Sequence, residues 1–175
     1  MQTERTLILG IGNRIVGDDA IGLVVAERLY SEFVSACPDR SVDLKMAEFA
    51  GWRLIDLLQG YERVVIIDAM IADTRDPGEC FRVTSTAQGM AHMRTSHGLG
   101  ICEALKLAEM SGLPMPTDIA IYAITASRTT EFSEELSPQL TARISGITRE
   151  ILTDITESES AGTHYAISTT TAPHR

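Results

Sequence analysis

Residues 9–22 read LGIGNRIVGDDAIG and follow a short apolar run, Thr6 to Leu9. Within these fourteen residues the chain has four glycines and two adjacent acids, Asp18 and Asp19. An apolar run, a glycine-rich turn and an amphipathic stretch, in that order, indicate a buried strand that leads into a helix of an α/β fold. The turn raises a question about function: either its glycines cradle a phosphate or its acids carry the chemistry.

The glycines match a nucleotide-binding loop only in part. Gly10 and Gly12 fit the first half of the dinucleotide motif G-x-G-x-x-G, but its third glycine would fall at Ile15. No Gly-Lys-Ser/Thr sequence follows, so the turn is not a Walker loop either. Two carboxylates at the start of the helix would also repel an anionic ligand. A nucleotide- or anion-binding domain is therefore an alternative that we disfavour.

The acid pair has a structural interpretation beside the chemical one. A helix that begins at Asp18 or Asp19 is stabilised when one of these carboxylates caps its first turn. We expect one of the two acids to be such a cap. Because a cap needs only one side chain, the second acid is left for another task.

The remaining chain alternates short apolar runs with longer amphipathic segments. Runs that are apolar on both faces predict interior strands of a parallel sheet, here residues 6–9, 63–69 and 118–124. Alternating apolar and polar residues predict a strand nearer an edge at 42–46. Helical periodicity predicts helices at residues 18–31, 51–58, 98–110 and 136–155.

Residues 80–85 (CFRVTS) break this alternation. Only about ten residues separate them from the strand that ends at Ala69, too few for a parallel crossover. We therefore expect an antiparallel edge strand. The predicted fold is a three-layer α/β arrangement: a mostly parallel, five-stranded twisted sheet with helices on both faces and one antiparallel edge strand. Residues 1–157 are expected to form this single domain, and the polar residues 158–175 a disordered tail.

Composition sets the broad class of the protein. The chain has 175 residues, enough for one domain, and a net charge of −9. This charge argues against nucleic acid or an anionic membrane as the partner. Three widely spaced cysteines without a C-x-x-C pair fit reduced thiols, and we recognise no signal peptide and no apolar run long enough to span a membrane. We expect a soluble, cytoplasmic monomer.

Three residues with metal-binding side chains are expected at the carboxyl edge of the sheet. Asp68 follows the apolar run 64–67, and the turn after the first strand delivers Asp19 to the same edge. His97 precedes the helix predicted at 98–110. Two carboxylates and one imidazole from three loops suit a divalent metal such as zinc, nickel or manganese. Each residue alone has an ordinary structural explanation, so the set is a hypothesis.

Four segments, in this order and spacing, resemble the nickel–iron hydrogenase maturation endopeptidases. They are LILGIGNRIVGDDAIG (7–22), AGWRLIDLLQGYERVVIIDAM (50–70), SHGLGICEALKLAEMSG (96–112) and IYAITASRTTEFSEELSPQL (121–140). The first segment is the most specific, because G-x-G-N followed by G-D-D/E-x-x-G is a hallmark of that family. The resemblance covers about residues 6–155.

The resemblance implies a metal-dependent endopeptidase that removes a short C-terminal extension from the precursor of a hydrogenase large subunit after nickel insertion. The family's metal-contacting acids and histidine correspond to Asp19, Asp68 and His97, which would be catalytic residues as well as metal ligands. It also implies that nickel arrives with the substrate and is the recognition signal, while other divalent metals can occupy the site. A non-catalytic sensor of the partner's metal would need the same three residues.

One loop departs from the family pattern. Relatives often have Gly-Gly-Thr before an Ala-Gly pair, where this chain has Ala47-Glu48-Phe49. Glu48 and Phe49 are bulkier, and one of them is charged. Because partner discrimination usually resides in loops, we expect this change to affect the choice of substrate more than the chemistry. The second acid of the pair is Glu in some relatives and Asp19 here, and both can bind a metal.

Overall fold

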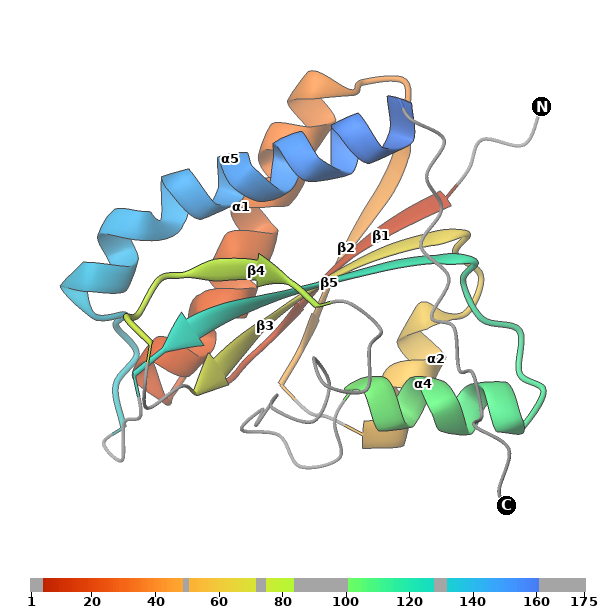
Figure 1. Cartoon of the computed structure of the whole chain (residues 1–175), viewed down its shortest axis with the longest axis horizontal. Coiled ribbons are helices and arrows are strands. Elements are labelled where there is room, and N and C mark those ends of the chain that lie inside the picture. The colour runs from red at the N-terminus through yellow and green to blue at the C-terminus, as the bar shows by residue number, and fades with distance from the viewer. Residues whose placement is uncertain (1–4, 49–50, 72–74, 84–100, 128–131, 161–175) are drawn as a thin grey trace, which may run out of the picture.

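The computed structural model describes residues 5–48, 51–71, 75–83, 101–127 and 132–160 (Figure 1). Its five-stranded sheet has the order β2-β1-β3-β5-β4. The strands are β1 (Arg5–Ile11), β2 (Ser41–Ala47), β3 (Arg63–Ile71), β4 (Cys80–Arg82) and β5 (Asp118–Ala126). Neighbouring strands run parallel, except that β4 pairs antiparallel with β5 at one edge. The predicted fold is confirmed, including the antiparallel edge strand.

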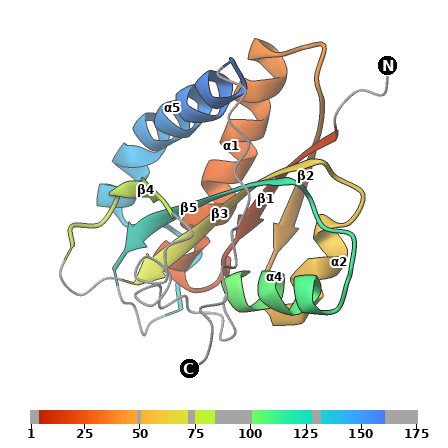
Figure 2. The ribbon, with the colours of Figure 1, turned by 45° about the vertical axis from the view of Figure 1, so that its right-hand side comes forward.

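Helices cover both faces of the sheet (Figures 1 and 2). One layer holds α1 (Ile21–Ala36) and α5 (Pro138–Ser160), and the other holds α2 (Leu54–Leu58), α4 (Ile101–Met110) and the short 3-10 helix η2 (Gly51–Arg53). The side chains of β3 alternate between these layers, as the pleat of a strand requires. Val65 and Ile67 pack in the cluster with α1 and α5, whereas Val64 and Ile66 pack in the cluster with α2 and α4.

Several element boundaries differ from the sequence-based expectation; the edge strand predicted at residues 80–85, for example, ends at Arg82. The helix predicted from residue 18 begins as a 3-10 turn, η1 (Gly17–Ala20), before α1 starts at Ile21. Strand β3 continues to Ile71, so Asp68 lies within the strand and not at its end. Helix α5 extends to Ser160, beyond the helix end predicted at residue 155. That prediction rested on a lack of apolar residues, but a packed helix can grow without them because each added residue gains a backbone hydrogen bond.

The rest of the predicted tail, residues 161–175, lies outside the described residues. Among the described helices, none combines the length and the apolar character needed to cross a bilayer.

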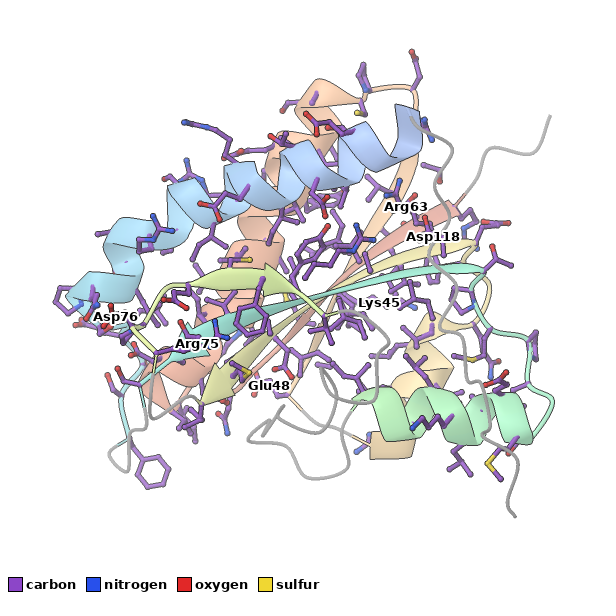
Figure 3. All side chains as sticks on the ribbon, viewed as in Figure 1. Lys45, Glu48, Arg63, Arg75, Asp76 and Asp118 are labelled. Carbon is purple, nitrogen blue, oxygen red and sulfur yellow. The ribbon has the colours of Figure 1, made fainter. Side chains whose placement is uncertain are left out.

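A buried ion pair joins two strands and a helix at the amino end of the sheet. Arg63 and Asp118 are the first residues of β3 and β5 and are partners in the strand register. The Arg63 Nε atom lies 3.2 Å from Asp118 Oδ2, and both side chains are buried. Arg63 Nη2 also donates a hydrogen bond of 3.1 Å to the Ile155 carbonyl of α5. Figure 3 shows the two side chains together where their strands begin.

We predict that Asp118→Asn lowers the free energy of unfolding by about 3 kcal/mol, because it removes the countercharge from a buried guanidinium. The double variant Arg63→Met/Asp118→Leu should lose less than Asp118→Asn alone, since it leaves no charge in the interior. Urea denaturation measures both. The control is Glu32→Gln, which breaks an exposed ion pair of similar length on α1 (3.0 Å) and should cost less than about 1 kcal/mol. Equal losses in Asp118→Asn and Glu32→Gln would contradict the interpretation.

Candidate functional site

Two glycines bring the start of α1 into contact with the carboxyl ends of β1 and β3. A Cβ atom on Gly22 would lie 2.2 Å from the Ile11 carbonyl oxygen and 2.7 Å from that of Ile67. A Cβ atom on Gly12 would lie 2.2 Å from the Asp19 carbonyl oxygen. Any side chain at either position would separate the helix from the strands. The glycines of the opening motif therefore allow close packing of the chain against itself.

This packing places Asp19 and Asp68 at one edge of the sheet. The site of a Cβ on Gly22 is 3.1 Å from the Asp68 Cα, and Asp19 precedes Gly22 by three residues, about one helical turn. Ile67 is the last residue of β3 that pairs with β1, so Asp68 lies where β1 turns away. Both acids are buried, with 3% of Asp19 and 1% of Asp68 exposed. Asp68 follows Val64 and Ile66 in the alternation of β3, which assigns it to the face that α4 covers.

His97, the third predicted site residue, lies outside the described residues. The helix that follows it in the sequence, α4, belongs to the layer that Asp68 faces. Among the residues that the structure describes, no group of three or more His, Cys, Asp or Glu side chains is arranged to hold a metal ion. Since His97 is not among them, the predicted set of Asp19, Asp68 and His97 stays a prediction.

Asp18 has a partner that the sequence analysis did not identify. We expected one of the two acids to cap its own helix, but neither η1 nor α1 has a side-chain cap. Asp18 Oδ1 instead accepts a hydrogen bond of 2.7 Å from the backbone N–H of Ser137, just before α5. The expectation was wrong because Asp18 binds a segment 119 residues away. A serine followed by a proline, as at Ser137 and Pro138, predicts the start of a helix. This pattern does not indicate that the Ser137 N–H binds Asp18.

The loop that contains Asp18 also pairs directly with the loop between β5 and α5. Val16 and Ser133 form an isolated parallel bridge. In it, Gly17 N–H donates to the Ser133 carbonyl at 2.7 Å, and Ser133 N–H donates to the Ile15 carbonyl at 3.1 Å. Together with the Asp18–Ser137 bond, these contacts attach the acid loop to the β5–α5 loop at two points, Ser133 and Ser137.

Two further sequence features have clear surroundings. Glu48, which departs from the family pattern, lies 3.5 Å from Arg14 Nε, and Arg14 also pairs with Glu27 of α1 at 2.8 Å. Phe49, the residue after Glu48, lies outside the described residues. Cys80, a free thiol on the edge strand, is a poor nucleophile because burial raises its pKa to about 12.

The chain belongs to the hydrogenase maturation protease (HycI) family, whose model matches residues 38–154. Members of this family are endopeptidases that act in the maturation of hydrogenases. The Hydrogenase 2 maturation protease of Escherichia coli K12 is 24% identical over 156 residues, covering 88% of this chain and 92% of that protein. The matched range includes Asp68 and His97, whereas Asp19 precedes it.

Solved structures of similar proteins show the same fold. The [NiFe] hydrogenase maturation protease HybD from Thermococcus kodakarensis is 27% identical, with a TM-score of 0.61, and the match covers 86% of this chain and 98% of that one. The hydrogenase maturating endopeptidase HybD from E. coli is 22% identical, with a TM-score of 0.61 and coverage of 88% and 93%.

We predict that Gly22→Ala lowers the free energy of unfolding by about 3 kcal/mol, because the added methyl group would collide with two backbone carbonyls. Chemical denaturation provides the measurement. Gly146→Ala is the matched control: its Cβ would meet nothing closer than 3.6 Å within helix α5. That variant should gain roughly 0.5–1 kcal/mol from reduced backbone entropy in the unfolded chain. A Gly22→Ala protein as stable as the wild type would show that the close contact is dispensable.

We predict that Asp18→Ala destabilises the protein by about 2 kcal/mol, because it deprives the Ser137 N–H of its acceptor. Asp18→Asn should lose less than about 1 kcal/mol, since its amide oxygen can still accept the bond. Hydrogen exchange of the Ser137 amide should accelerate in the Ala variant and stay close to wild type in the Asn variant. Equal acceleration in both would mean that the negative charge matters more than the acceptor.

Proposed function

We propose that this endopeptidase removes the C-terminal extension of a nickel–iron hydrogenase large-subunit precursor after nickel has been inserted. In this proposal Asp19, Asp68 and His97 contact the metal that the precursor brings. The family supports the class of reaction. The observation that carries the choice of residues is the burial of Asp19 and Asp68 at the edge where α1 meets the sheet.

The two acids fit a cation by charge and by position. Asp19 and Asp68 are both buried, and they bring two acidic side chains to one end of the sheet. Their negative charge would attract a divalent cation, and carboxylate oxygens with an imidazole are accepted ligands of nickel, zinc and manganese. Because Asp68 faces the layer that contains α4, the segment just before α4 is a reasonable source of the third ligand, His97.

The proposal gives the chain's own residues separate tasks. Asp19 and Asp68 supply the negative charge that attracts the cation, and His97 supplies a neutral nitrogen ligand. Asp18 keeps the loop that holds Asp19 attached to the start of α5 through Ser137. A bound divalent metal can polarise the carbonyl of the bond to be cut or lower the pKa of a water molecule.

The surroundings of the glycines disfavour the nucleotide alternative. In a phosphate-binding loop, glycines leave room for the ligand to approach the backbone. Here the space beside Gly12 is filled by the Asp19 carbonyl, and the space beside Gly22 by the carbonyls of Ile11 and Ile67. Buried Asp18 and Asp19 add negative charge to the same loop.

We predict that Asp19→Asn lowers the rate of precursor processing by about 100-fold or more, because it removes a charge from the proposed metal site while keeping the shape of the side chain. The assay incubates the enzyme with nickel-loaded precursor and follows the shortened large subunit by electrophoresis and mass spectrometry. Asp18→Asn is the matched control, with the same chemical change one residue earlier, and should retain processing within about fivefold because its hydrogen bond to Ser137 can persist.

Three outcomes of this assay are informative. Wild-type processing by Asp19→Asn would exclude Asp19 as a metal ligand. Capture of the nickel-loaded precursor by the wild-type protein without a shortened product would support the sensor alternative. Cleavage of nickel-free precursor at the same rate as the loaded form would exclude nickel as the recognition signal.

A further inference from the structure

Two large apolar side chains are exposed beside the acid loop. Phe132 is 84% exposed and Ile15 is 50% exposed, although both belong to segments that hydrogen bonds hold in place. Ile15 precedes Asp19 by four residues in the turn after β1. Phe132 lies in the loop between β5 and α5. Most large apolar residues of the described chain are buried, so this pair calls for an explanation.

The backbone bridge brings these two residues side by side. Val16 and Ser133 are partners in a parallel bridge, so the residues that precede them, Ile15 and Phe132, are also neighbours. The Ser133 N–H donates to the Ile15 carbonyl at 3.1 Å, so the backbone of Phe132, the residue that precedes Ser133, lies next to Ile15. The backbones of two exposed apolar residues from distant parts of the sequence, Ile15 and Phe132, are therefore adjacent, and we call this pair the apolar surface.

Hydrogen bonds hold the backbone of Ile15 and of Ser133, the residue after Phe132. The Ile15 N–H donates to the Asn13 side-chain oxygen at 3.1 Å, and the Ile15 carbonyl accepts the Ser133 N–H. The Asp18–Ser137 bond holds the other end of the β5–α5 loop. Backbone that such bonds already hold has less conformational entropy to lose when a partner covers it, which favours binding.

The surface is continuous with the candidate site. Asp19 N–H donates to the Val16 carbonyl at 3.1 Å, so the acid follows the bridge within a single turn. Figure 1 shows the start of α5 and the start of α1 at the end of the sheet where β3 and β5 terminate. A polypeptide with its scissile bond at Asp19 would have to pass beside these loops. Glu134 and Glu135, both exposed, follow Phe132 in its loop and disfavour an acidic segment there.

We propose that Ile15 and Phe132 form a docking surface for an apolar side chain in the extended segment of the precursor next to the bond that is cut. This inference rests on the proposed function and names where the substrate is held. An exposed aromatic ring beside a β-branched side chain offers the kind of contact that dominates peptide recognition. The surface contributes affinity, whereas Asp19 and Asp68 contribute the chemistry.

The test compares two double variants, in which the substituted side chains have similar exposed fractions in the wild-type protein. Ile15→Ser/Phe132→Ser removes the surface. Leu107→Ser/Met110→Ser is the control, because Leu107 is 50% exposed and Met110 is 86% exposed. Both control residues lie near the end of α4. The chain continues from there to the start of β5, so this end of α4 leads to the amino end of the sheet, away from the acid loop. Thermal denaturation should show little change in either variant, since none of the four side chains is buried.

Processing of nickel-loaded large-subunit precursor is measured as a function of precursor concentration. We expect the KM of Ile15→Ser/Phe132→Ser to rise by about tenfold or more while its kcat stays within about threefold of wild type. The control variant should keep both values. A wild-type KM in Ile15→Ser/Phe132→Ser, or an equal rise in the control, would overturn the proposal.

Two further measurements separate this inference from the proposed function. Capture of the precursor on immobilised enzyme reports binding whether or not cleavage occurs, so weaker capture by Ile15→Ser/Phe132→Ser alone supports the docking surface even if the chain does not cut. Analytical ultracentrifugation tests the other occupant, a second copy of this chain. A wild-type dimer that Ile15→Ser/Phe132→Ser converts to a monomer would overturn the substrate proposal.

Discussion

The contact between the first turn of α1 and the ends of β1 and β3 is the constraint on which the site depends. It exists because Gly12 and Gly22 have no side chains where carbonyl oxygens approach within 2.2 Å of a Cβ position. The contact brings the turn that contains Asp19 toward Asp68, at the point where β3 loses its pairing with β1. Glycine is needed at these positions for packing, and the acids gain their position from that packing.

The two adjacent acids of this turn have different surroundings. Successive residues of a 3-10 turn point in directions roughly 120° apart, so neighbours in the sequence can reach different partners. Asp18 reaches the start of α5 and holds Ser137. Asp19 lies buried one turn from the contact with Asp68. The same set of loop contacts fixes the acid turn and the exposed apolar pair, so the proposed chemistry and the proposed docking surface share one scaffold.

The two ends of the sheet are organised differently. At the amino end, the buried Arg63–Asp118 pair and the Ile155 carbonyl tie β3, β5 and α5 together. At the carboxyl end, the strands finish at unequal lengths and leave room for loops. Open α/β sheets generally bind ligands at this second end, because helix starts and loop backbones converge there. The family, the buried acids and the apolar pair all agree with that arrangement.

The sequence by itself determined which segments form strands and helices and that the strand predicted at residues 80–85 runs antiparallel, because apolar periodicity and loop length act locally. It also indicated Asp19 and Asp68 as candidate site residues, although Asp68 lies within β3 and not at its end. Only the tertiary structure assigned Asp18 to Ser137, paired Arg63 with Asp118 and joined Val16 to Ser133. Each of these contacts joins segments far apart in the chain, and no local pattern encodes which distant residue completes a hydrogen bond or an ion pair once the layers have packed.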